Sequence, residues 1–192
     1  MQRCDWVPDD SLMIEYHDKE WGFPLHNDRK LFEFLILDGF QAGLSWSTIL
    51  KKRENFRRAF AEFDAEKIAK FGDNEVQELL QNKGIIRNKL KISATIKNAK
   101  AYLKILETKD SFDQYLWQFV EGKTIINKWK TWKEIPAQTG ESEAMSKDLK
   151  KHGFSFVGPT ICYAFMQAAG MVNDHTVSCF LYEKINKEFI NL

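Results

Sequence analysis

A chain of 192 residues can form one substantial domain or two small lobes around a shared cleft, and 44% hydrophobic with 29% charged residues is an ordinary globular composition. No signal peptide and no long apolar run is present, which excludes a membrane-spanning protein and predicts a soluble cytoplasmic one with reduced thiols. The net charge of +1 does not by itself indicate a nucleic-acid partner.

Helical patterns dominate the first half of the chain. Asp28 caps a buried helix that ends near Gly39 or Gly43, and this helix is rich in leucine and phenylalanine. Ser45 caps a second helix that extends to about Phe60. Two shorter helices begin at Asp64 and Asp73.

Helices are also predicted for most of the second half. A long helix over residues 87–106 follows from apolar residues spaced near 3.6 positions apart. Further helices cover residues 111–120, 142–151 and 160–169, the last of the series, and residues 121–141 form a loop. The only strand-like segment, residues 124–126, is too short to matter, so the predicted class is all-α.

Positive charge is concentrated in two stretches of this nearly neutral chain. Residues 81–104 contain seven Lys or Arg and no acidic residue, and residues 51–58 contain five basic residues against Glu54. A basic stripe of this kind fits phosphate binding, and it equally fits a solvated helix face.

Residues that bind metals lie at opposite ends of the sequence. His175 and Cys179 are four residues apart, so their side chains point the same way on a helical turn. Cys4 and His17 complete a Cys2His2 set, which suits tetrahedral zinc. Four protein ligands would close the site and join the chain ends, giving it a structural role. The alternative is that the spacing of His175 and Cys179 is coincidental, that Cys4 is a surface thiol and that His17 caps a helix.

Three neighbouring residues bear on this site. Asp18 and Asp174 each adjoin one of the histidines, and either they orient the imidazole rings or they are simple helix-end charges. Cys162 lies in the apolar run ICYAFM and is predicted to be a core residue.

Aromatic residues cluster in the first fifty positions, where Trp6, Tyr16, Trp21 and Trp46 exceed what a core there needs. Asp38 follows the apolar run LFEFLIL. Aromatic rings facing a carboxylate would form a slot for a flat, cationic heterocycle. The alternative is a set of core aromatics with a solvated aspartate.

Residues 82–87 form a short glycine-containing turn ahead of the basic helix. The free amides and positive dipole at a helix N-terminus can hold DNA phosphates without reading the sequence. The turn is similar to a helix-hairpin-helix element, although Ile86 replaces its second glycine, and a plain helical hairpin fits equally well.

Several long segments together resemble the 3-methyladenine DNA glycosylase I family, over essentially residues 1–180. They are RCDWV at 3–7, YHDKEWG at 16–22, QAGLSWSTILKKRENF at 41–56, GIIRNKLKI at 84–92, KHGFSFVGPTICYAFMQAAG at 151–170 and NDH at 173–175. The last twelve residues fall outside the resemblance.

The resemblance implies a helix-hairpin-helix glycosylase fold in which two helical lobes flank a cleft. It also implies a single glycosylase domain over residues 1–192, with a helix-hairpin-helix-like element at 81–92. By the resemblance, one structural Zn2+ is bound by Cys4, His17, His175 and Cys179. The residues expected to line the base pocket are Trp6, Met13, Tyr16, Trp21, Asp38 and Trp46. The residues expected to contact DNA are Gly43, Leu44, Gly84, Ile86, Arg87 and Lys89.

Two positions depart from the family pattern. Asp38 stands where the family has a glutamate, so its contact with the base amine is lost or bridged by water. Met13 stands where an aromatic residue is usual, which changes the expected shape of the pocket.

The resemblance implies a monofunctional enzyme that excises 3-methyladenine from alkylated double-stranded DNA by hydrolysis. It acts in base excision repair and is expected to be a monomer. The nucleotide leaves the duplex, Tyr16 and Trp46 hold the base, and Asp38 reads its amino edge and charge. No aspartate near the sugar and no lysine for lyase chemistry is identified. One alternative is a non-catalytic protein that binds DNA damage and whose chain ends are joined by zinc. Another is a zinc hydrolase, which would need an open coordination position on the metal.

Overall fold

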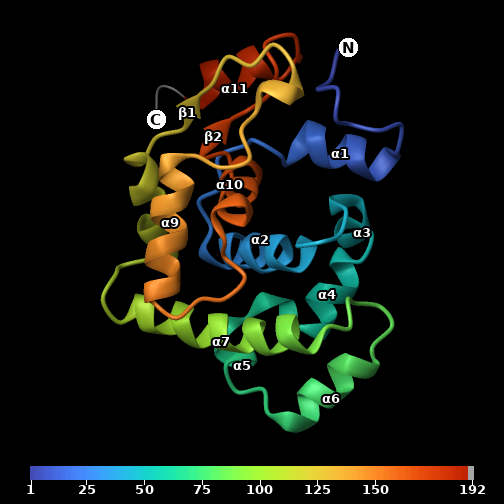
Figure 1. Ribbon diagram of the computed structural model, residues 1–192, viewed down its shortest axis with the longest axis vertical. Helices are drawn as coiled ribbons and strands as arrows, with labels where there is room; N and C mark the ends of the chain where they lie inside the picture. Colours follow the sequence, from blue (N-terminus) through green and yellow to red (C-terminus); the bar gives the residue numbers. More distant parts are fainter. Residues whose placement is uncertain (190–192) are drawn as a thin grey trace.

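The computed structural model describes residues 1–189, in which helices surround a central helix and one two-stranded sheet joins distant segments (Figure 1). The first half holds α1 (Ser11–Lys19), α2 (Asp28–Gln41), α3 (Trp46–Leu50), α4 (Arg53–Ala59), η1 (Ala61–Phe63), α5 (Ala65–Ile68) and α6 (Asp73–Gln81). The second half holds α7 (Lys89–Leu106), α8 (Phe112–Trp117), η2 (Gln118–Val120), β1 (Ile125–Ile126), η3 (Trp132–Glu134), α9 (Gly140–Lys151), α10 (Pro159–Ala168), β2 (Val172–Asn173) and α11 (Tyr182–Phe189).

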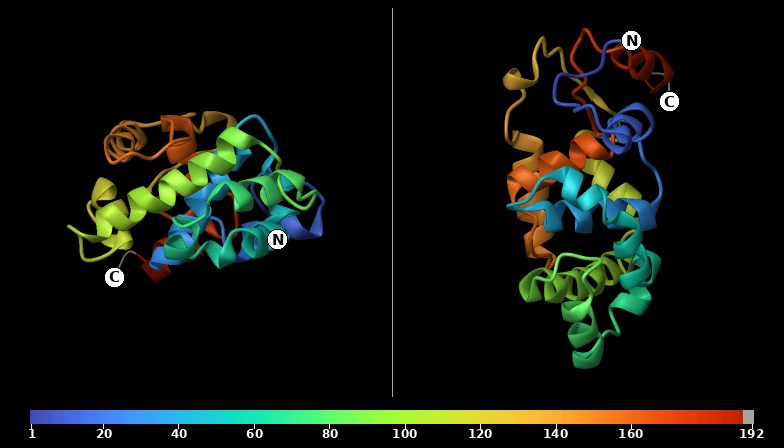
Figure 2. Two further views of the ribbon diagram at one scale, coloured as in Figure 1. Left: turned by 90° about the horizontal axis from the view of Figure 1, so that it is seen from below. Right: turned by 90° about the vertical axis from the view of Figure 1, so that its right-hand side faces the viewer.

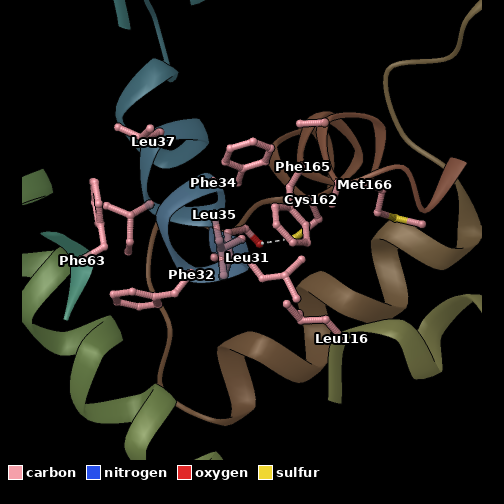
Figure 3. Packing of buried hydrophobic residues seen from close by; sticks show 14 of the residues in the cluster. Leu31, Phe32, Phe34, Leu35, Leu37, Phe63, Leu116, Cys162, Phe165 and Met166 are labelled. Atoms are coloured by element: carbon pink, nitrogen blue, oxygen red, sulfur yellow. Dashed lines mark hydrogen bonds between the residues drawn. The ribbon is translucent and has the colours of Figure 1, made fainter. Parts of the chain in front are cut away.

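The central helix is α2, which is buried at every position from Leu31 to Phe40. A helix that is apolar all round must be enclosed by other helices, and α2 contacts α3, α7, α8 and α10. Figure 3 shows this packing, with Leu31, Phe34 and Leu35 of α2 facing Cys162 and Phe165 of α10. The core therefore holds α2 fixed, and with it any polar side chain that α2 carries near its end.

The helices form layers on either side of α2. Figure 1 places α7, with α5 and α6, on one side of α2 and the two chain ends on the other, and Figure 2 shows the same order from the side. The long helix α7 begins where the Asn88 side chain accepts a hydrogen bond from the amide of Lys91.

The two chain ends meet on one side of the molecule (Figure 1). There β1 pairs in parallel with β2, with Ile125 opposite Val172 and Ile126 opposite Asn173. The amide of Phe180 donates to the carbonyl of Gln2, so the segment after β2 lies against the N-terminal segment. This arrangement brings residues more than 150 positions apart into one region.

The all-α class is confirmed, but several boundaries differ from the sequence-based expectation. The helix predicted from Ser45 to Phe60 is two helices, α3 and α4, separated at Lys51 and Lys52. At this break the ammonium of Lys52 donates to the carbonyls of Lys83 and Gly84 in the turn after α6. A contact between segments so far apart is not encoded in local periodicity.

Two α-helices, the 3-10 helix η3 within the predicted loop 121–141, and one strand pair were not expected. Helix α1 is short and capped by the Asp10 side chain, and α11 follows the segment predicted to close the helical series, so α10 is not the last helix. The pairing of β1 with β2 gives residues 125–126 a defined role. The predicted domain extends to Leu192, and residues 190–192 lie outside the described part. None of the helices within residues 1–189 has both the length and the hydropathy needed to cross a bilayer.

Candidate functional site

Four side chains that bind metals converge at the junction of the chain ends. Cys4, His17, His175 and Cys179 are all buried, and their ligand atoms lie within 4.8 Å of one another. The Sγ of Cys179 is 3.5 Å from both His17 Nε2 and His175 Nδ1, and Cys4 Sγ is 3.5 Å from His175 Nδ1. Two sulfurs and two imidazole nitrogens at these separations match the donor set of a closed, four-coordinate site.

The second nitrogen of each histidine is already engaged, which sets the ring orientation. His17 Nδ1 lies 2.8 Å from the Asp18 carboxylate, and His175 Nε2 lies 3.1 Å from the carbonyl of Trp21. A ring that donates one N–H to such an acceptor keeps its other nitrogen free as a ligand. The nitrogens left free, His17 Nε2 and His175 Nδ1, are those that face the sulfurs. Asp18 is itself held by Arg3 through three hydrogen bonds, two from Nε and one from Nη2.

The two thiols lie together in the cluster, and their pKa values shift in opposite directions. The contact with Cys4 is the main cause that lowers the pKa of Cys179, and the two histidine rings lower it further. The same contact, followed by burial, raises the pKa of Cys4. Cysteines bind metal ions as thiolates, so a divalent cation in this cluster would stabilise the deprotonated sulfurs.

The local geometry of the second pair differs from the helical turn that its spacing suggested. His175–Cys179 is a non-helical turn, closed by a 2.8 Å hydrogen bond from the Cys179 amide to the Thr176 carbonyl. Both residues nevertheless point at the same place because the turn packs against Cys4. A core position for Cys162 is confirmed, since its side chain is buried between α10 and α2.

Asp174 neither orients a histidine ring nor acts as a simple helix-end charge. Its carboxylate is 1% exposed and accepts hydrogen bonds from four side chains. These come from Asn127, Trp129, Tyr163 and Gln167, at 2.7–2.8 Å. Four donors compensate a buried carboxylate well, so Asp174 fixes α10 to the segment after β1.

A cavity of about 380 Å³ opens between the metal-ligand cluster and the end of α2. The predicted Trp6, Tyr16, Trp21, Asp38 and Trp46 all line it. Met13 does not; it is buried in the core. Residues that the sequence reading missed complete the lining: Gln41, Trp132, Lys133, Ile135, Pro136, Ala137, Thr160, Tyr163, Ala164 and Gln167.

The walls of this cavity are aromatic and tightly packed. The Tyr16 and Trp46 ring centroids are 5.2 Å apart, and those of Trp6 and Trp21 are 4.9 Å apart. Two walls rest directly on the metal-ligand cluster: Trp21 is 4.7 Å from the ring of His175, and Trp6 is 5.5 Å from that of His17. The cluster therefore positions half of the aromatic slot.

Three buried polar atoms of the cavity lining have no hydrogen-bond partner in the described part of the chain. Asp38 is 2% exposed, and its Oδ2, together with Nε1 of Trp6 and Nε1 of Trp46, has no hydrogen-bond partner within residues 1–189. Burial raises the pKa of Asp38 well above its ordinary value, and burial followed by the nearby Asp38 raises that of Tyr16. Buried polar atoms are rarely left unpaired unless a ligand uses them.

The loop after α2 is exposed and firmly anchored. Gly43 has φ of +80°, which favours glycine, and Leu44 is 40% exposed. Behind this loop the ammonium of Lys91 donates to the carbonyls of Phe40 and Ala42, both at 2.7 Å. Burial lowers the pKa of Lys91, which is 7% exposed. A lysine from α7 thus caps the end of α2 and fixes the loop.

The predicted DNA-contacting turn joins α6 to α7. The amide of Gly84 donates to the Asn82 side chain at 2.8 Å, and the Ile86 side chain packs against the core. Arg87 and Lys89 are exposed, so their side chains are available for phosphate contacts.

Taken together, the helical scaffold carries a buried four-residue cluster that could hold a metal ion and an aromatic cavity with one unpaired acid. The methyladenine glycosylase family model matches residues 6–182, and the chain belongs to this family. It is 51% identical over 182 residues to DNA-3-methyladenine glycosylase 1 of Escherichia coli (strain K12), covering 95% of this chain and 97% of the relative.

Solved structures agree with this assignment. The fold is similar to a crystal structure of 3-methyladenine DNA glycosylase I, with a TM-score of 0.92 and 53% identity over 93% of this chain and 98% of the other. A second similar structure holds a variant of such a glycosylase in complex with 3-methyladenine. Its TM-score is 0.91 at 34% identity, over 94% of this chain and 97% of the other.

Proposed function

We propose that this chain is a DNA-3-methyladenine glycosylase, which removes the alkylated base by hydrolysing its bond to the sugar. The observation that carries the proposal is the buried, unpaired carboxylate of Asp38 in an aromatic cavity of about 380 Å³. The similar glycosylase structure that holds 3-methyladenine supports the same ligand for this cavity.

Charge explains why this cavity selects an alkylated base. Methylation at N3 makes adenine cationic, whereas normal adenine is neutral. A buried carboxylate without partners is unfavourable alone and is compensated when a cation lies beside it. Tyr16 and Trp46 hold the ring faces, and each stacked ring contributes about 1–3 kcal/mol. Asp38 reads the charge and the amino edge, either directly or through a water molecule.

The reaction needs little assistance once the base is bound. The bond between the sugar C1′ and N9 of the base breaks, and its electron pair stays with the base, which leaves as neutral 3-methyladenine. Water adds to C1′ and then loses a proton. The positive charge on the alkylated base has already weakened this bond, so the protein acts mainly by extruding, orienting and enclosing the base.

The base reaches the cavity by leaving the duplex. Leu44, on the anchored loop beside Asp38, fills the space left in the base stack, while Gly43 supplies the turn that exposes it. Arg87 and Lys89 contact phosphates and position the duplex without reading its sequence. The proposed enzyme is monofunctional, so no lysine amine attacks the sugar.

We further propose that the ion held by Cys4, His17, His175 and Cys179 is zinc, with a structural role. Sulfur and imidazole donors favour zinc over magnesium or calcium, and four protein ligands leave no open position for a hydrolytic water. Bound zinc would join the chain ends and hold Trp6 and Trp21 in place through the two histidine rings. Metal analysis of the purified protein tests this: we expect about one zinc per chain, and a different metal would contradict it.

The activity is tested with methylated duplex DNA, from which released bases are separated by chromatography. We expect 3-methyladenine as the principal product from the wild-type chain, and a loss of about 100-fold or more for Asp38→Asn. Specific binding of the lesion without base release would identify a damage-binding protein instead, and would contradict the proposal.

A further inference from the structure

A basic and aromatic segment lies at the mouth of the cavity. Residues 128–133, Lys-Trp-Lys-Thr-Trp-Lys, are here called the strap. They lie in the connection between β1 and α9, which Figure 1 draws in amber near the chain ends. Trp132 and Lys133 line the cavity, and Trp132 is nevertheless 48% exposed. An indole half open to solvent beside a ligand cavity is available for a further contact.

The strap is held in place at its middle. The indole N–H of Trp129 donates to Asp174 at 2.7 Å, and the Trp129 carbonyl accepts from the amide of Val177 at 2.9 Å. Asp174 also binds Tyr163 and Gln167 of the cavity wall. The strap and the wall therefore share one buried carboxylate, which fixes the strap at Trp129 against the cavity wall.

The charges of the strap are unpaired. Lys128, Lys130 and Lys133 are exposed, and within the described part of the chain no acidic group lies close enough to form an ion pair with any of them. The sole acidic residue of segment 127–137, Glu134, accepts a hydrogen bond from the Lys130 amide at 2.8 Å. Three exposed lysines without an ion-pair partner in the described chain thus lie along the strap, and one of them, Lys133, lines the cavity that holds Asp38.

A nucleotide bound in this cavity would bring its phosphates to the cavity mouth. The base enters the slot, while its sugar and the two flanking phosphates stay at the mouth because the backbone must continue into the duplex. We infer that the strap binds this extruded segment of DNA: Trp132 packs against the sugar, and Lys128, Lys130 and Lys133 contact the flanking phosphates. This inference rests on the proposed function, because it takes DNA carrying the lesion as the ligand.

The lysine contacts are tested by the salt dependence of binding to a duplex with a stable abasic-site analogue, which needs no catalysis. The strap variant K128Q/K130Q/K133Q is compared with K70Q/K109Q/K147Q, which removes three exposed lysines that lie outside both the cavity and the two basic stretches. Each lost phosphate contact lowers the slope of log affinity against log salt by about 0.9, so we expect the strap variant to lose about 2–3 and the control almost nothing. Equal slopes for the two variants would overturn the inference.

The Trp132 contact is tested with Trp132→Ala and Trp132→Phe. Because the indole is proposed to touch the sugar and not the base, Trp132→Ala should lower affinity for the abasic duplex about tenfold and leave the affinity for free 3-methyladenine unchanged. Trp132→Phe should recover most of the loss. If Trp132→Ala bound the abasic duplex with the wild-type affinity, or lost affinity for the free base to the same extent, this placement of Trp132 would be contradicted.

These measurements separate the strap from the proposed activity. If the wild-type chain released no 3-methyladenine while the strap variants still lost their salt dependence, the glycosylase proposal would fail and the strap would stand. If release occurred normally and the slopes did not change, only the strap would fail.

Discussion

The unpaired acid in the cavity makes a prediction about stability as well as activity. Asp38 is buried in the last turn of α2, where the helix dipole disfavours negative charge, and its Oδ2 has no hydrogen-bond partner within residues 1–189. We expect Asp38→Asn, which removes the charge and keeps the shape, to make the ligand-free protein more stable at pH 7.5.

The magnitude follows from the cost of burying such a group. A buried polar atom without a partner costs about 1–3 kcal/mol, and more when it is charged. Because the amide of an asparagine is also buried there, part of that cost stays, so we expect a gain of about 1–2 kcal/mol. For a chain of 192 residues this raises Tm by about 2–8 °C.

The effect has a definite pH dependence. Burial raises the pKa of Asp38 in the folded chain above the ordinary value of 3.8, so the wild-type protein loses stability as pH rises through that raised pKa. Below pH 3.8 the carboxyl is protonated in both folded and unfolded chains, and the two proteins should then differ little. Thermal unfolding of both proteins across this range measures the difference. A variant less stable than wild type at pH 7.5, or a Tm difference independent of pH, would refute the reasoning.

Three further perturbations test other parts of the site. Cys179→Ser should lower the zinc content and reduce Tm by several degrees, whereas Cys162→Ser, which alters a buried thiol outside the cluster, should keep the zinc; equal zinc content in both would contradict the assigned ligands. Leu44→Ala should reduce base excision from duplex DNA about tenfold without changing affinity for free 3-methyladenine, and a parallel loss of both would count against a role in extrusion. Lys91→Met should also impair duplex excision more than free-base binding, because the carbonyls of Phe40 and Ala42 lose their anchor; unchanged excision would show that the loop needs no such support.

Much of the helical core was predictable because its signals are local. The apolar run from Leu31 to Phe40 predicts a buried helix, and α2 is buried along this whole stretch. Regular spacing likewise located α7 within two residues of its observed start at Lys89. The break at Lys52 and the pairing of Ile125 with Val172 were not predictable, because each depends on a segment distant in sequence.

The residues of the candidate site likewise divide into those that the sequence identified and those that reach the cavity only through tertiary packing. The aromatic residues near the N-terminus and the acid at position 38 were found from composition and family resemblance, and the structure brings Trp6, Tyr16, Trp21 and Trp46 around Asp38. The wall supplied by α10 and by residues 132–137 was missed because it reaches the cavity only through tertiary packing. The alternation of lysine and tryptophan in the strap was the available signal for that second segment.

The metal-ligand cluster and the cavity form one physical unit. The rings of His17 and His175 touch Trp6 and Trp21, so loss of the ion should disturb the slot as well as the chain ends. We therefore expect the cluster to influence binding of the base through these ring contacts.

The central claim is that a buried acid and an aromatic slot hold a cationic, extruded adenine while its bond to sugar is hydrolysed. Quantifying the bases released from methylated duplex DNA by the wild-type chain and by Asp38→Asn tests it most directly. The account predicts 3-methyladenine as the main product of the wild-type chain and release at least about 100-fold slower from the variant. Equal release by both proteins, or none from the wild-type chain in molar excess over lesions, would contradict it.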